Sequence, residues 1–166
     1  MICLFSKIET MNKTKNYRPN VAAVIVSSRY PEEKKVFVAE RSDISGMWQF
    51  PQGGIDAGET PSEALFRELE EEIGTAEIEI IGEHPEWISY DFPKHVAKKM
   101  HPFHGQTQRY FLVRLKDDSL VNLETEHPEF KDHKYVDVDA VLNMVAKFKK
   151  PVYEQVIEHF KKEGLL

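Results

Sequence analysis

The sequence has little of what several classes of protein require. Its 166 residues include one cysteine, Cys3, which excludes an internal disulfide and a metal site built on cysteines. No apolar run approaches the roughly 20 residues needed to cross a bilayer, and the apolar start at residues 1–5 is too short for a signal peptide. We therefore expect a cytoplasmic protein with no membrane partner.

Positive charge is also scarce. The chain has 22 basic and 28 acidic residues and a net charge of −6. Duplex DNA is bound by neutralising its phosphates with a basic surface, so this balance argues against duplex DNA as a partner. No acid occurs between Asp91 and Asp117, a stretch that instead carries basic residues and histidines: Lys94, His95, Lys98, Lys99, His101, His104, Arg109, Arg114 and Lys116.

The order of apolar patterns predicts one α+β domain. Hydrophobic residues make up 41% of the chain, which is enough for one core. Buried or alternating segments predict strands at residues 21–26, 36–40, 76–81, 87–92, 109–115 and 135–138. Helices are expected at residues 61–73, 139–148 and 151–162. Mostly strands, with one early helix and two late ones, predict a mixed sheet between helices, preceded by a loose N-terminal arm at residues 1–16.

The helix at residues 61–73 has clear end signals and a cluster of acids. Thr60 is a good N-cap and Gly74 a stop signal. At about 100° per residue, three glutamates share one face, beside an apolar stripe and not opposite it: Glu68, Glu71 and Glu72. The stripe consists of Leu65, Phe66, Leu69 and Ile73. Such a face is either solvated acidic surface or a site for a divalent cation, which prefers hard oxygen ligands.

The glycine loop before this helix favours the metal site. A pattern of fixed residues and spacings here resembles the Nudix box. It consists of Gly53, five residues, Glu59, seven residues and then Arg67-Glu68-Leu69-Glu70-Glu71-Glu72-Ile73-Gly74. Thr75 departs from the pattern, because the family prefers an aliphatic residue at this peripheral position. The resemblance implies a Nudix-type α/β/α sandwich over residues 17–166. It also implies hydrolysis of phosphoanhydride bonds with Mg²⁺, for which Mn²⁺ can substitute.

The resemblance also assigns roles by position. It implies that the metal is bound by Gly53, Glu68, Glu71 and Glu72. Arg67 would pair with Glu59 and orient the carboxylates. A bound metal would neutralise the polyphosphate and lower the pKa of a water molecule, and a carboxylate such as Glu72 or Glu68 could accept the proton.

Four further motifs are similar to the bacterial RNA pyrophosphohydrolase group, which includes dinucleoside polyphosphate hydrolases. They are residues 17–21, 48–54, 105–111 and 128–130. The likeness implies removal of pyrophosphate from the 5′-triphosphate end of RNA. It leaves open hydrolysis of diadenosine tetraphosphate and, more remotely, a non-catalytic nucleotide sensor. Loss of a carboxylate from the Nudix box would favour a sensor, and none is missing.

The same group implies roles for residues remote from the box. Glu129 would be a further metal ligand or base, although an ordinary loop acid is the alternative. The residues that resemble phosphate and nucleotide contacts are Arg18, Arg41, Tyr90, Gln106, Gln108 and Lys149. The alternatives are a solvent-exposed surface position for Arg41 and Lys149, and a core position for Tyr90. The histidines at 95–104 have irregular spacing and no cysteine partner, which argues against zinc.

Overall fold

The computed structural model describes residues 14–166, so most of the expected arm at residues 1–16 lies outside the described part. Within that part, no helix is both long and apolar enough to cross a membrane. The elements in chain order are β1 (Tyr17–Val26), β2 (Val36–Arg41), β3 (Trp48–Gln49), β4 (Gln52–Gly54), α1 (Pro61–Ile73), β5 (Ile78–Glu83), β6 (Ile88–Asp91), α2 (Lys94–Lys99), β7 (Gly105–Leu115), η1 (Asp118–Leu120), β8 (Phe130–Val136), η2 (Val138–Asn143) and α3 (Lys150–Lys162).

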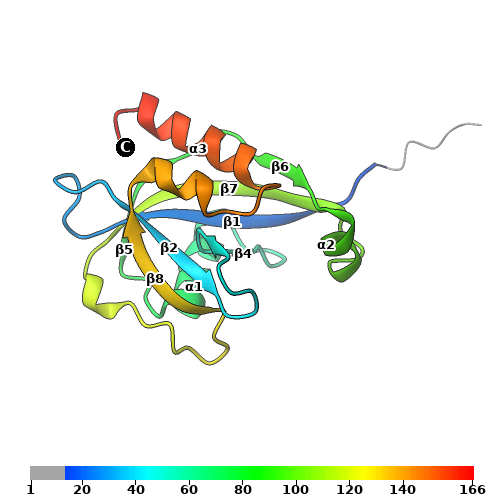
Figure 1. Ribbon diagram of the computed structural model, residues 1–166, viewed down its shortest axis with the longest axis horizontal. Coiled ribbons are helices and arrows are strands. Elements are labelled where there is room, and N and C mark those ends of the chain that lie inside the picture. Colours follow the sequence, from blue (N-terminus) through cyan, green and yellow to red (C-terminus); the bar gives the residue numbers. More distant parts are fainter. Residues whose placement is uncertain (1–13) are drawn as a thin grey trace, which may run out of the picture.

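A mixed sheet of eight strands runs through the middle of the domain (Figure 1). Its main path is β3-β2-β1-β7-β5, with β4 paired to β1, β6 to β7 and β8 to β2. The two longest strands, β1 and β7, are parallel from the Tyr17–Gly105 pair to the Val26–Arg114 pair. The other pairings are antiparallel. The sheet is therefore mixed, as predicted.

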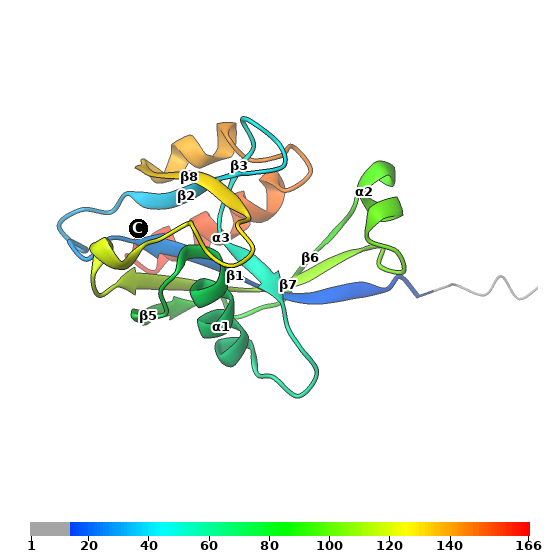
Figure 2. The same ribbon diagram turned by 90° about the horizontal axis from the view of Figure 1, so that it is seen from below.

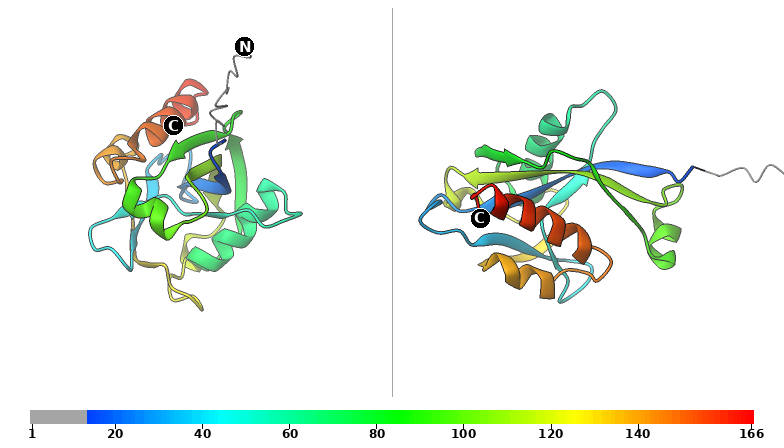
Figure 3. Two further views of the ribbon diagram at one scale, coloured as in Figure 1. Left: turned by 90° about the vertical axis from the view of Figure 1, so that its right-hand side faces the viewer. Right: turned by 90° about the horizontal axis from the view of Figure 1, so that it is seen from above.

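Helices cover both faces of this sheet (Figures 2 and 3). Side chains along β1 alternate, so Val24 joins the core under α3 and η2, whereas Ile25 joins the core under α1. The α3 core includes Phe50 and Tyr153, whose rings stack with centroids 4.4 Å apart. Two apolar layers on either side of one sheet make an α/β/α sandwich, which confirms the predicted fold class.

The helix α1 shows how local signals position the carboxylates. The backbone N–H of Glu63 donates to the Thr60 side chain at 3.2 Å, and Gly74 ends the helix with φ +78°. These caps fix the helix at Pro61–Ile73, the range predicted from the sequence. Leu65, Leu69 and Ile73 are buried as expected, but placing Phe66 on the apolar face was wrong, because 38% of it is exposed.

Three differences from the sequence prediction lie around the sheet edges. The helix expected at residues 139–148 is wrong: a 3-10 helix covers Val138–Asn143 and turns follow, consistent with the low helix propensity of valine and asparagine there. The last strand is Phe130–Val136, and its polar residues are held by pairing with β2. The basic segment after Pro93 forms α2, a short helix that was not expected.

Candidate functional site

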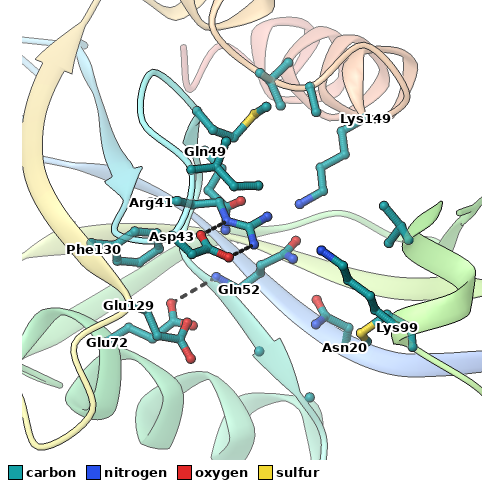
Figure 4. A pocket seen from close by; sticks show the side chains of 18 of the residues that line it. Asn20, Arg41, Asp43, Gln49, Gln52, Glu72, Lys99, Glu129, Phe130 and Lys149 are labelled. Atoms are coloured by element: carbon teal, nitrogen blue, oxygen red, sulfur yellow. Dashed lines mark hydrogen bonds and ion pairs between the residues drawn. The ribbon is translucent and has the colours of Figure 1, made fainter. Parts of the chain in front are cut away.

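A cavity of about 880 Å³ lies at one end of the sheet. Its wall is built from the glycine loop, α1, the loops before β3 and β8, α2 and the segment before α3 (Figure 4). The residues predicted from the sequence that line it are Arg18, Arg41, Gly53, Glu68, Glu71, Glu72, Tyr90, Glu129 and Lys149. Side chains from distant parts of the chain are therefore gathered around one space.

Glu72 is the most buried carboxylate of this cavity, with 3% of the residue exposed. Its Oε2 accepts one hydrogen bond, from the backbone N–H of Gln52 at 3.2 Å. Burial raises its pKa well above the usual range, and the nearby carboxylates of Glu129 and Glu68 raise it further. Figure 4 shows Glu129 beside Glu72, although their elements are far apart in sequence. A divalent cation would relieve this repulsion, so the donor set fits a hard metal ion.

Glu68 lies next to the glycine loop. A Cβ atom on Gly53 would be 1.9 Å from the carboxyl carbon of Glu68, so only glycine allows this approach. Burial raises the pKa of Glu68, whereas Arg67, whose Nη1 donates to Oε1 at 2.8 Å, lowers it. Glu68 thus reaches the cavity as a partly buried carboxylate against the loop backbone.

Glu71 lies at the edge of the cluster, with 58% of its side chain exposed and 3.3 Å from the Nη1 of Arg67. Over residues 14–166, no three Asp, Glu, His or Cys side chains already converge as a preformed metal site. Arg67 forms ion pairs with Glu68 and Glu71, while the backbone N–H of Gln52 donates to Glu72. A cation bound by Glu68 and Glu71 would compete with Arg67 for these carboxylates.

Arg67 connects the helix to the loop. Its Nε donates to Glu59 Oε2 at 2.7 Å, and its Nη2 donates to Glu59 Oε1 and to the carbonyl of Gly54, both at 2.8 Å. The hydrogen bonds from Arg67, and then one from the backbone N–H of Asp56, lower the pKa of Glu59 to about 2. A guanidinium suits this position because its planar fork reaches several acceptors at once.

Cationic side chains face the same cavity. Lys149 is 7% exposed and its amine points into the pocket (Figure 4). Burial, and then the charge of Arg41, lower its pKa to about 8, while Glu72 acts in the opposite direction. Arg41 donates two hydrogen bonds to Asp43, at 2.9 and 2.7 Å. Arg18 lies against Gly54, where a Cβ would be 2.3 Å from its Nη2. Carboxylates and cations thus share one cavity, an arrangement suited to a metal-bound polyphosphate.

The two glutamines lie behind the cavity wall, in a buried hydrogen-bond network. Gln108 donates to the side chains of Asn20 and Gln52, both at 2.8 Å, and accepts from Tyr110 at 2.9 Å. Gln106 accepts from the hydroxyl of Tyr90 at 2.7 Å. Tyr90 itself is buried and forms part of the inner wall. In the structure, Gln108 supports Gln52, whose backbone N–H binds Glu72.

Several lining residues were not identified from the sequence as site residues: Asn20, Asp43, Gln52 and Phe148. Asn20 and Gln52 do fall within motifs that carried the family resemblance, at residues 17–21 and 48–54. The basic charge of the α2 segment was noted in the sequence, but its helical structure was not predicted.

The sandwich fold and the carboxylate-lined cavity define a Nudix hydrolase. The chain belongs to the NUDIX domain family, whose sequence profile matches residues 16–156. Hydrolases of this family use divalent metal cations.

Two relatives cover nearly the whole chain. A protein of a Nitratiruptor species named RNA pyrophosphohydrolase is 60% identical over 150 residues, which are 90% of this chain and 97% of the relative. A protein of the same name from Campylobacter jejuni subsp. jejuni is 56% identical over 156 residues, covering 94% of this chain and 100% of the relative.

Solved structures show the same fold at low identity. The E. coli dihydroneopterin triphosphate pyrophosphohydrolase superposes with a TM-score of 0.65 and 21% identity, covering 85% of this chain and 97% of that one. A C. elegans Ap4A hydrolase in a binary complex gives a TM-score of 0.63 and 16% identity, covering 87% and 98%. These similarities establish the fold and leave the substrate to be argued separately.

Proposed function

We propose that this protein is a magnesium-dependent RNA pyrophosphohydrolase that removes pyrophosphate from the 5′-triphosphate end of RNA. The near full-length similarity to two relatives of that name, at 56–60% identity, supports the choice of substrate. The observation that carries the chemistry is the cavity in which Glu68, Glu72 and Glu129 face Arg41 and Lys149. Such a cavity accepts a polyphosphate and the cations that accompany it.

In this proposal the carboxylates of Glu68 and Glu72 hold the metal, with Glu71 at the rim and the Gly53 backbone beside them. Bound magnesium neutralises the polyphosphate and lowers the pKa of a water molecule. Arg67 is a positioning residue, because it holds the glycine loop to α1 through Glu59 and Gly54.

The proton of the attacking water goes to the Glu72–Glu129 pair. Burial, and then the nearby carboxylate of Glu129, raise the pKa of Glu72, which increases the affinity of Glu72 for a proton. Water attacks a phosphorus of the triphosphate, and the phosphoanhydride bond between the α- and β-phosphates breaks. The products are pyrophosphate and an RNA that bears a 5′-monophosphate. Arg41 and Lys149 bind the phosphate oxygens and orient the chain.

The test is release of pyrophosphate from 5′-triphosphorylated RNA with magnesium, with a 5′-monophosphorylated RNA as control and diadenosine tetraphosphate assayed in parallel. We expect release that excess chelator abolishes and magnesium or manganese restores. Cleavage of diadenosine tetraphosphate without release from RNA would contradict the proposal and support the dinucleoside polyphosphate alternative. Full activity in excess chelator would contradict the metal mechanism, and binding without turnover of either substrate would indicate a nucleotide sensor.

A further inference from the structure

The helix α2 presents one face to the cavity. His95, Val96 and Lys99 of α2 line the cavity, as does Met100, the residue that ends the helix, whereas Lys98 does not line it. Phe92, just before the helix, continues the same wall. The face therefore combines an ammonium group with apolar side chains and the aromatic ring of Phe92, which suits a phosphate beside a base.

Lys99 and Lys149 enter the cavity from different elements (Figure 4). Lys149 lies near Arg41 and Glu72, because the charges of both residues shift its pKa. Lys99 enters from α2, and its charge contributes, after that of Arg41, to lowering the pKa of Asp43 in the loop between β2 and β3. The cavity thus has a second cationic position, on the α2 side.

In the proposed mechanism Arg41 and Lys149 bind the polyphosphate at the carboxylates. The chain that follows the first nucleotide of an RNA has to leave the cavity past its wall, and it carries a phosphodiester at each step. An ammonium group on a flexible stem binds such a phosphate as a point charge. Val96 and Met100, one on each side of Lys99 along the same face, supply apolar surface for a base.

We propose that α2 binds the RNA chain beyond the first nucleotide, with Lys99 contacting the phosphodiester that follows it. This inference rests on the proposed function and makes α2 the element that favours RNA over substrates without a phosphodiester. Diadenosine tetraphosphate contains phosphoanhydrides and no phosphodiester, so its binding does not depend on Lys99.

The test compares Lys99→Ala with Lys98→Ala, a matched control on the neighbouring residue of the same helix. The Michaelis constant and turnover are measured at low salt for a 5′-triphosphorylated RNA tetranucleotide and for diadenosine tetraphosphate. If diadenosine tetraphosphate is not cleaved, its inhibition constant as a competitive inhibitor is measured instead. We expect Lys99→Ala to raise the Michaelis constant for the tetranucleotide about fivefold, the size of a partly solvated charge contact, with turnover within about twofold. Binding of diadenosine tetraphosphate stays within about twofold of the parent in this variant, and Lys98→Ala matches the parent on both. Lys99→Arg, which keeps the charge, restores most of the lost affinity.

A second readout is salt. The Michaelis constant of the parent protein for the tetranucleotide rises with salt concentration, and the slope is smaller in Lys99→Ala because one phosphate contact is gone. Equal losses on both substrates would overturn the inference, because Lys99 would then bind the polyphosphate. Unchanged constants on both would also overturn it. A parent protein that releases nothing from the tetranucleotide would instead reject the proposed function, and this outcome is seen before any variant is assayed.

Discussion

Arg67 donates to both carboxylate oxygens of Glu59, from Nε at 2.7 Å and from Nη2 at 2.8 Å. This ion pair connects the loop before α1 to the helix, next to Glu68, which Arg67 also contacts. We expect Arg67→Lys to lower turnover roughly tenfold or more, because an ammonium cannot reach Glu59, Gly54 and Glu68 together. Turnover and thermal melting are measured beside Arg29→Lys, a control in an exposed ion pair with Glu33. An Arg67→Lys enzyme as active as this control would show that the loop keeps its position without the fork.

Glu72→Gln separates catalysis from stability. We expect turnover to fall by about 10² to 10⁴, the range for loss of a catalytic carboxylate. The raised pKa means that the folded protein disfavours the charged form, so Glu72 costs stability as pH rises above 4.5, the ordinary value for a glutamate. Without metal, the variant should therefore melt no lower than the parent at pH 7, and it should gain less from added magnesium. A large loss of metal-free stability at pH 7 would contradict the unpaired-charge interpretation of Glu72.

Glu129→Gln tests the carboxylate that comes from the loop before β8. Its proximity to Glu72 predicts a fall in turnover of about 10² or more, with the fold retained. Glu124→Gln, an exposed acid in the same loop that does not line the cavity, is the control. Turnover is measured with saturating magnesium, and folding is checked by circular dichroism. If the turnover of Glu129→Gln is within twofold of that of the control, Glu129 is an ordinary loop acid with no catalytic role.

The two adjacent glycines allow a paired experiment. An alanine at Gly53 would displace the carboxylate of Glu68, whereas an alanine at Gly54 would displace the guanidinium of Arg18. Both are ends of flexible side chains, so the fold should persist. We expect Gly53→Ala to reduce turnover chiefly and Gly54→Ala to raise the Michaelis constant chiefly. Steady-state kinetics on triphosphorylated RNA measures both constants, and the opposite pattern would contradict the roles proposed for Glu68 and Arg18.

Lys149 predicts a pH dependence. Its pKa of about 8 lies below the ordinary 10.5, so its positive charge is lost as pH rises through about 8. Since Lys149 binds phosphate in the proposed mechanism, kcat/KM should fall across that range, and Lys149→Arg should flatten this part of the profile. The depressed pKa also means that this group favours the folded state increasingly between pH 8 and 10.5. A Lys149→Arg profile identical to that of the parent would place the titration elsewhere.

The amino-acid sequence determined those features that depend on neighbours along the chain. The ends of α1 follow from Thr60 and Gly74, and the shared side of Glu68, Glu71 and Glu72 follows from helical geometry alone. The apolar runs of β1 and β2 were readable because both faces of these strands are covered, and that made the sandwich predictable.

Tertiary packing decided the rest, because burial and charge depend on residues distant in sequence. The sequence left Lys149 open between phosphate contact and exposed surface, and the core under α3 buries it facing Arg41 and Glu72. The polar strand β8 exists because β2 offers it a hydrogen-bonding edge, and the loop before it brings Glu129 to Glu72. Lys98 and Lys99 are equivalent in the sequence, and only the orientation of α2 separates them, because it places Lys99 alone of the two in the cavity wall.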